Sequence, residues 1–234
     1  MTRKEYIEAV KAKLEEISPF EEPTTFIAAD GDSDYANVKP IISYIDGTLD
    51  EATRNCLRAL PLTLLHSDIE TTTPSISIAA DGVATFNIST DERYVRFRHP
   101  ELKRDITSFI TTEDSLYLLQ QNKYTRGGLA KPVAVVSSDV TSGIGKMEIY
   151  SLEKRSSSRT DTTNGRLLKI NINKKVGVAA DYTGVTPATA LVQSPISELV
   201  VLECAAMVAD ILGDVNAAQV IRQEQLTKVQ AVLQ

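Results

Sequence analysis

The chain has 234 residues and a formal net charge of −6, with 42 % hydrophobic and 24 % charged residues. That size allows a well-buried core, in one large domain or in two small ones. Cys56 and Cys204 are far apart in the sequence and form no CxxC or Cys/His pattern, which excludes a disulfide framework or a cysteine zinc site and predicts two buried free thiols.

The first part of the chain is predicted to be helical. From Thr2 to Ile17, apolar residues recur at helical spacing between lysines and glutamates. The chain shows no signal peptide and no apolar run of about 20 residues, so we expect a soluble protein made in a reducing compartment. Phe26–Asp34 is polar and turn-rich, which predicts a loop or an extended arm. Asp46-Gly47 then predicts a break, after which Thr48 and Glu51 form a capping box that opens a new helix.

From Thr71 the pattern changes from helical to alternating, which is typical of β-strands. An Asp81-Gly82 turn between two alternating runs predicts a hairpin. The stretch Ser156–Gly165 is rich in Ser and Thr, and we expect an exposed loop there. Further strands are expected at Tyr94–Arg98, Ile106–Ile110, Pro132–Ser137, Lys146–Leu152 and Leu167–Lys174.

One segment among these strands combines a helix end, a turn and a strand entry. Glu113–Gln120 is predicted to be a short helix. Gly127-Gly128 can adopt positive φ without a Cβ clash, and Pro132 holds the residue before it extended. Arg126 stands at the turn, where its guanidinium can clamp a neighbouring carboxylate or carbonyl.

The C-terminal part returns to helical spacing. From Ile196 to Leu212, apolar residues lie nearly all around the helix axis, and such a helix is buried on most sides. We expect neighbouring subunits to provide part of that cover. A second, more polar helix is expected from Val215 to Leu233. A narrow polar stripe consists of three acidic residues, Glu203, Asp210 and Asp214.

The order of these elements predicts an α+β fold, with terminal helices packed as a bundle and a β-rich region inserted between them. Residues 1–70 are expected to form the N-terminal helices and arm, and residues 71–190 the β-rich middle. Residues 191–234 are expected to form C-terminal helices that pack with the N-terminal ones.

Charge is distributed unevenly along the chain. The stretch Arg93–Lys175 contains 16 Lys/Arg and 8 Asp/Glu, whereas the remaining segments contain 9 basic and 23 acidic residues. Acidic flanks around a basic middle suit self-assembly, because opposite patches on identical copies can meet head to tail. An ordinary solvated surface explains the asymmetry equally well.

The basic strand Arg93–His99 interleaves arginines with aromatic residues. Its side chains have the chemistry to contact nucleic acid phosphates or to stack on bases. We favour a solvated sheet face or a subunit contact, because the chain is acidic overall.

The sequence contains no recognisable catalytic pattern. His66 and His99 are the only histidines, and neither stands in an HExxH context or near a Gly-x-Ser-x-Gly motif. Structural roles are therefore expected for both. We predict that the protein is not an enzyme and uses no metal and no cofactor.

Three segments carry a resemblance to a known family: Tyr44–Leu62, Arg93–Val136 with its Tyr124-Thr-Arg-Gly-Gly-Leu-Ala-Lys-Pro132 turn, and Ile196–Gly213 with the helix after it. In their order the chain resembles the tail ring or head–tail connector (tail tubular adaptor-like) proteins of short-tailed bacteriophages, in particular of the crAss-like group. The likeness covers the chain from about Tyr44 onward. Its motifs are packing and turn patterns, so no catalytic residue is transferred.

The resemblance implies a structural subunit of the virion tail, made in the bacterial host cytoplasm. It implies a homo-oligomeric ring, commonly of twelve copies, that is coaxial with the portal and lets the genome pass. The implied partners are other copies of the chain, the portal protein, adjacent tail ring proteins and DNA bound without sequence specificity, with no membrane.

Two groups of residues are candidate sites within such a ring. The acidic stripe of Glu203, Asp210 and Asp214 is expected either to face a DNA channel, where like charge lets DNA slide, or simply to face solvent. The candidate inter-subunit or inter-ring contacts are Arg93, Arg96, Arg98 and Arg126. The alternative function is a surface carbohydrate- or peptide-binding module without catalysis, which the absence of tryptophan disfavours.

Overall fold

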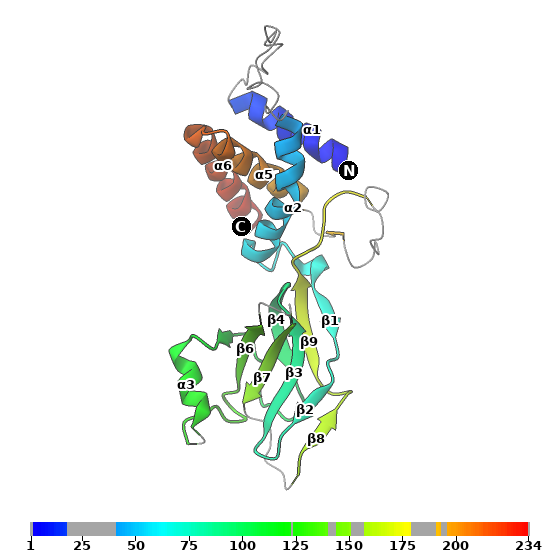
Figure 1. Cartoon of the computed structure of the whole chain (residues 1–234), viewed down its shortest axis with the longest axis vertical. Helices are drawn as coiled ribbons and strands as arrows, with labels where there is room; N and C mark the ends of the chain where they lie inside the picture. Colours follow the sequence, from blue (N-terminus) through cyan, green and yellow to red (C-terminus); the bar gives the residue numbers. More distant parts are fainter. Residues whose placement is uncertain are drawn as a thin grey trace, which may run out of the picture. The chain divides into compact units, whose positions relative to one another are not determined.

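A computed structural model describes residues 2–17, 41–122, 124–139, 144–150, 157–178, 191–192 and 196–233. Within these ranges it contains five α-helices and nine strands in two sheets (Figure 1). The predicted α+β class is confirmed. The chain divides into two compact units, a helical unit of Met1–Asp68 with Ile172–Gln234 and a sheet unit of Ile69–Asn171. The arm predicted at Phe26–Asp34 lies outside the described residues.

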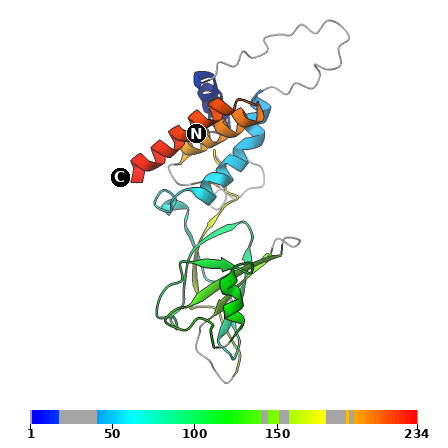
Figure 2. The same cartoon turned by 90° about the vertical axis from the view of Figure 1, so that its left-hand side faces the viewer.

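The helical unit is built around one central helix. Its helices are α1 (Arg3–Ile17), α2 (Ile41–Ala59), α5 (Ser197–Ile211) and α6 (Val215–Leu233). Helix α5 packs against each of the other three, and Figures 1 and 2 show it between α2 and α6. The helices from the two ends of the chain therefore share one core.

The apolar surface of α5 is covered by its own chain. Nine of its fifteen residues are buried, and they lie on almost every side of the helix: Leu199, Val200, Val201, Leu202, Cys204, Ala205, Ala206, Val208 and Ala209. Because α1, α2 and α6 supply this cover, the expectation that neighbouring subunits are needed to bury α5 is wrong. Its exposed apolar residue is Ile211, at the C-terminal end.

Helix α2 runs through the position where the sequence predicts a break. It continues without interruption from Ile41 to Ala59, and Thr48 lies in its middle instead of at an N-cap. The Thr48 hydroxyl donates to the carbonyl of Tyr44, one turn earlier, and lies 3.3 Å from the Cys204 sulfur. The capping-box prediction fails because Leu49 and Ile45 are both fully buried, and only a continuous helix places both in the core.

The sheet unit contains two sheets. The three-stranded sheet has the order β1-β9-β4, and the six-stranded sheet has the order β5-β6-β7-β3-β2-β8. All pairings are antiparallel except β5 with β6. The strands are β1 (Glu70–Thr72), β2 (Ile76–Ile78), β3 (Val83–Ser89), β4 (Glu92–Arg98), β5 (Phe109–Thr111), β6 (Val133–Asp139), β7 (Ile144–Tyr150), β8 (Arg159–Asp161) and β9 (Arg166–Asn171).

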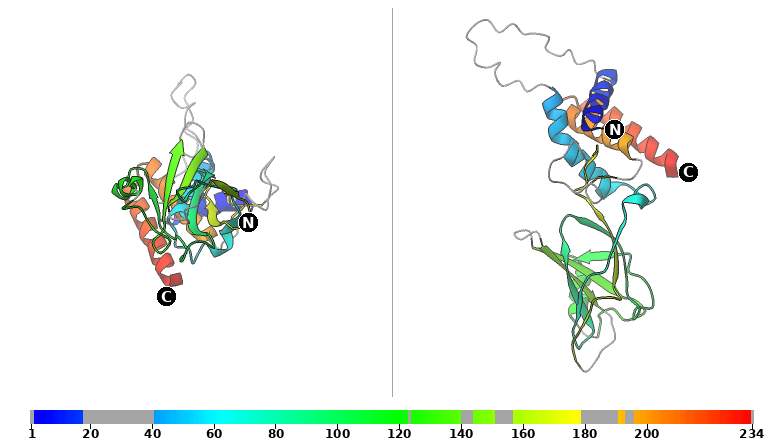
Figure 3. Two further views of the ribbon diagram at one scale, coloured as in Figure 1. Left: turned by 90° about the horizontal axis from the view of Figure 1, so that it is seen from below. Right: turned by 90° about the vertical axis from the view of Figure 1, so that its right-hand side faces the viewer.

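The core of this unit joins both sheets. Phe97 of β4 and Leu167 of β9 pack in one cluster with residues of β2, β3, β6 and β7, and the Phe86 and Phe97 rings stack at 5.5 Å. One short helix, α3 (Ser115–Gln121), lies beside the six-stranded sheet, as Figures 2 and 3 show. Each sheet therefore packs one face on the shared core, and its other face is not part of that core.

Two turn predictions have opposite outcomes. The Asp81-Gly82 hairpin is confirmed: β2 and β3 pair antiparallel, and Gly82 has φ 86°. Gly127 and Gly128 are not among the described glycines with positive φ, which are Gly82, Gly177 and Gly213. The stretch predicted as an exposed loop, Ser156–Gly165, contains strand β8, because Arg159–Asp161 pairs antiparallel with β2; Asp161 is buried there.

The helical unit resumes at Ile172, within the range that the sequence assigns to the β-rich middle. Lys174 is buried there against Asp68, with its Nζ 3.3 Å from Oδ1 and 3.2 Å from the backbone oxygen of that residue. The expected boundary near residue 190 falls outside the described part of the chain. Among the described helices, none has the length and apolar character that would let it cross a membrane.

Candidate functional site

Strand β4 places its arginines on one face of the three-stranded sheet. The register between β4 and β9 shifts after Tyr94, so Val95 forms a β-bulge. A regular strand would send residues three positions apart to opposite faces, but the bulge lets Tyr94 and Phe97 both enter the core. The residues on the opposite face are Arg93, Arg96 and Arg98, which pair with Ile170, Leu168 and Arg166 of β9.

The aromatic rings of β4 are therefore not available to bases. Phe97 is fully buried, and Tyr94 packs on the core while its hydroxyl donates to the carbonyl of Ser89. Base stacking by this strand, which the sequence allows, is excluded by that geometry. Its arginines remain accessible.

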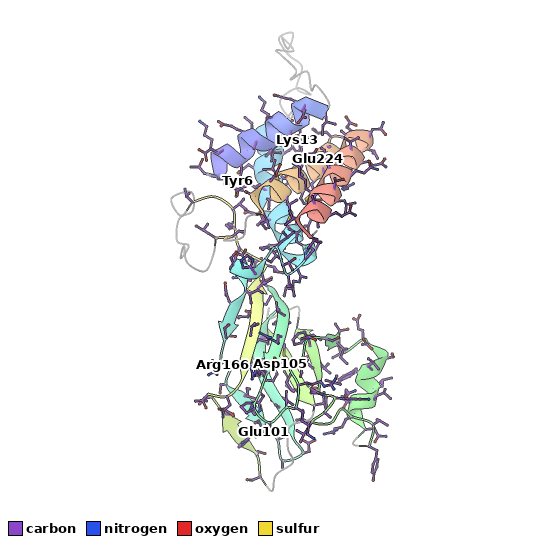
Figure 4. All side chains as sticks on the ribbon, turned by 180° about the vertical axis from the view of Figure 1, so that it is seen from behind. Tyr6, Lys13, Glu101, Asp105, Arg166 and Glu224 are labelled. Carbon is purple, nitrogen blue, oxygen red and sulfur yellow. The ribbon has the colours of Figure 1, made fainter. Side chains whose placement is uncertain are left out.

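Beside the predicted Arg96 and Arg98 lies a third arginine, Arg166, which was not predicted from the sequence. Arg98 of β4 lies directly opposite Arg166 of β9, and like charges at that position are destabilising. Arg98 is 73 % exposed and Arg96 is 48 % exposed. We call Arg96, Arg98 and Arg166 the arginine face; Figure 4 labels Arg166 and the nearby Asp105. Only a strand register, which the sequence does not reveal, could have found the third member.

The arginine face contains little opposite charge. The Asp105 carboxylate lies 3.7 Å from an Arg96 nitrogen and 3.8 Å from an Arg98 nitrogen. Both distances are longer than a hydrogen bond, so this one carboxylate offsets the charge of the two guanidiniums only in part. Arg166 donates to the backbone oxygens of Thr163 and Gly165, which are uncharged acceptors. The face is therefore strongly cationic.

The other two predicted arginines are engaged differently. Arg93 lies on the same side of β4 but is half-buried, and burial lowers its pKa. Arg126 lies 3.0 Å from the Asp81 carboxylate and 5.6 Å from the centre of the Tyr150 ring. Burial alone would raise the pKa of Asp81, but the Arg126 guanidinium and the Val83 N–H lower it below its usual value. The predicted clamp on a neighbouring carboxylate is confirmed, and it ties Arg126 to the β2–β3 turn.

The three predicted acidic residues play separate roles within the helical unit. Glu203 accepts a hydrogen bond from Asn55 of α2 at 3.2 Å. Asp210 is exposed and forms an ion pair with Arg222 of α6. Asp214 accepts from the Ala217 N–H at 2.9 Å and so caps the start of α6. Their role as a channel-facing stripe stays a prediction.

The structure also shows exposed apolar residues on α3 that were not predicted from the sequence as a site. Leu116, Leu118 and Leu119 are 48, 72 and 45 % exposed, and Tyr124 beyond the helix end is 83 % exposed. Two residues of α3 turn inward: Tyr117 packs against the sheet, and Gln120 is buried, donates to the Leu116 carbonyl and accepts from the Gly127 N–H at 2.8 Å. We call Leu116, Leu118, Leu119 and Tyr124 the α3 surface. Leucine periodicity in so short a helix cannot tell the inner face from the outer one.

The histidine and cysteine side chains are structural where they are buried. His99 is buried, its Nδ1 accepts from the Glu101 N–H, and its Nε2 therefore donates to Asp161 at 3.3 Å. Both cysteines are free and buried, as predicted, and burial raises the pKa of Cys204 to about 11. Within the described residues, no three His, Cys, Asp or Glu side chains converge as a metal site would require.

Asp161 is the centre of the buried network around His99. Burial would raise the pKa of Asp161, but hydrogen bonds from Thr163, Asn164 and His99 lower it well below its usual range. The network fixes the turn after β8 to the end of β4.

Neither a protein-family model nor a curated protein sequence matches the chain.

Proposed function

We propose that this chain is a non-enzymatic structural subunit of a bacteriophage tail, which forms an oligomeric ring in the head-to-tail connector through which DNA passes. It is made in the bacterial host cytoplasm and ends in the virion tail. Its partners are further copies of itself, the portal protein and the adjacent tail ring proteins. The family resemblance suggests this role, and the α3 surface is the observation that best supports it.

The α3 surface has the character of a contact surface. Helix α3 leaves three leucines at least 45 % exposed, whereas Gln120 is buried and Tyr117 packs against the sheet, so more apolar surface is left in solvent than one short helix usually exposes. The exposed fractions of the leucines amount to more than one and a half whole side chains, worth about 3–4 kcal/mol if buried at about 2 kcal/mol per leucine. An exposed apolar patch of this kind is typical of a protein–protein interaction site.

A ring uses such a surface in every copy. Each subunit of a ring offers one patch to the next subunit and a different patch to the previous one. We assign the α3 surface to the contact between neighbouring copies, because its three leucines are each at least 45 % exposed within the described part of the chain. The resemblance sets the expected copy number at twelve.

Sedimentation of the full chain, alone and mixed with a portal protein of a short-tailed phage, tests this proposal. We expect the wild type to form a large defined assembly in at least one of these conditions. Leu118→Gln should abolish the assembly and leave the fold intact, because that side chain is already 72 % exposed. The matched control is Leu226→Gln on α6, where the leucine is 62 % exposed.

Two results would contradict the proposal. Assembly that survives Leu118→Gln and fails in Leu226→Gln would move the contact from α3 to α6. A chain that stays monomeric in every mixture, and binds a glycan or a peptide, would support the alternative of a surface-binding module.

A further inference from the structure

We propose that the arginine face binds the phosphodiester backbone of double-stranded DNA without sequence specificity. Arg96, Arg98 and Arg166 present three guanidiniums on one side of a small sheet. This inference rests on the proposed function for its choice of DNA, and it assigns the DNA contact to the sheet unit instead of the acidic stripe.

The sheet maintains this arrangement at a cost to its own stability. Arg98 and Arg166 are a cross-strand pair of like charge, where an opposite charge or an apolar residue would stabilise the sheet. The bulge at Val95 is also what keeps Arg93 on the same side as Arg96 and Arg98. Bulges commonly re-aim side chains next to functional sites. The geometry therefore favours an anionic partner over intramolecular packing.

The adjoining loop adds to the positive charge. Lys103 and Arg104 follow β4 closely in the chain and are both exposed. The nearby Glu101 is already paired with Arg159, so among the described residues Asp105 is the carboxylate beside the arginine face. A partner must supply several negative charges to match this surface.

A phosphate backbone fits the arginine face better than the acidic side chains of a second copy. Among the described residues of the helical unit, several exposed acids already have basic partners, as in Asp210 with Arg222 and Glu198 with Lys228. DNA carries an unpaired negative charge on every phosphate. A guanidinium donates two parallel N–H bonds to phosphate oxygens, and Arg96 and Arg98 start about 7 Å apart along the strand, so each can reach its own phosphate.

The geometry also explains why recognition would not depend on sequence. Base readout needs side chains that enter a groove or rings that stack on bases. Tyr94 and Phe97 point into the core, so the outer face of β4 offers guanidiniums but none of its rings. Contacts of that kind position a duplex and carry no sequence information.

Fluorescence anisotropy with a labelled duplex of about 30 base pairs tests the inference. Three phosphate contacts predict an affinity that falls about 40-fold between about 50 and 200 mM salt. Arg96→Gln/Arg98→Gln should leave one contact and reduce that factor to about 3-fold. Lys4→Gln/Arg58→Gln removes the same charge from exposed positions in the helical unit, so it should bind as the wild type does.

Three outcomes would overturn the inference. The first is that the wild type binds no duplex at about 50 mM salt, and the second is that both double variants lose the same DNA affinity. The third is that poly-glutamate competes for the arginine face as well as DNA does, which would mark the face as a site for an acidic protein. The melting temperature checks that Arg96→Gln/Arg98→Gln folds, and it should stay level or rise as the like-charge pair is removed. Rings without DNA binding would contradict this inference alone, and DNA binding without rings would contradict the proposed function alone.

Discussion

The buried ion pair between Asp68 and Lys174 allows a sharp test of how the helical unit is held together. The two side chains are 0 and 2 % exposed, and the Lys174 Nζ lies 3.3 Å from the Asp68 Oδ1. Asp68 ends the N-terminal part of the helical unit, and Lys174 lies just after the chain re-enters it. Asp68→Asn keeps the shape of the side chain and removes its charge.

The expected loss follows from the burial of both groups. Removing one partner of a buried pair costs about 3–5 kcal/mol, because the other charge is left in a medium that solvates it poorly. Lys174 keeps the backbone oxygen of Asp68 at 3.2 Å, so we expect the lower end, about 3 kcal/mol. At about 2–4 °C per kcal/mol for a chain of this size, the melting temperature should fall by about 6–12 °C.

Urea unfolding followed by far-ultraviolet circular dichroism measures this loss. The double variant Asp68→Asn/Lys174→Met should recover most of it, because no charge is then left buried. The control is Asp50→Asn, which weakens partly exposed ion pairs with Arg3 and Lys175 and should cost less than about 1 kcal/mol. Equal losses in Asp68→Asn and Asp50→Asn would refute the reasoning, as would a double variant no more stable than Asp68→Asn.

Four further predictions concern the sheet unit. Burial lowers the pKa of His99, and protonation of its ring would also break the hydrogen bond from the Glu101 N–H. The stability of the sheet unit should therefore be full above about pH 6.5 and fall as the pH drops below that value. Hydrogen exchange of β4 at several pH values measures this, and a flat profile from about pH 7 to about pH 5 would contradict it. The lowered pKa of Asp161 should add a second loss below about pH 4, so its replacement by Asn should remove the acid branch of the same profile. Gly145→Ala should cost about 1–3 kcal/mol, since the new Cβ would meet a backbone oxygen at 2.9 Å and a buried isoleucine at 3.0 Å, and unchanged urea unfolding would show that the strands can move apart. Asp114→Ala removes the N-cap of the seven-residue helix α3 and should cost about 1 kcal/mol, with faster exchange confined to that helix; unchanged exchange there would show that Gln120 alone holds it.

The fold class and several elements could be predicted from the sequence because their causes are local. Helices α1 and α5 follow from the spacing of apolar residues, and the β2–β3 hairpin follows from Asp81-Gly82. In each case a few neighbouring residues contain the whole cause.

The remaining features depend on contacts between distant residues. A break at Asp46-Gly47 is plausible locally, but burial of Ile45 and Leu49 keeps α2 continuous. The bulge at Val95 exists because both Tyr94 and Phe97 pack on the core, and this sets which arginines share a face. Tertiary packing, not local propensity, decides such positions.

The candidate site was predicted only in part for the same reason. Arg96 and Arg98 were named from the basic strand, but their partner Arg166 is recognised only when β9 lies beside β4. The α3 surface was not predicted because the spacing of leucines in a seven-residue helix does not define an inner face, which the structure shows to contain Tyr117 and Gln120.

The most direct test of the central claim is the mass of the assembled particle, measured by native mass spectrometry on the full chain with and without a portal protein of a short-tailed phage. We predict a closed assembly of a fixed integer number of copies, twelve by the family resemblance. A single copy at every concentration, with and without that portal protein, would contradict the claim that this chain works as a ring subunit.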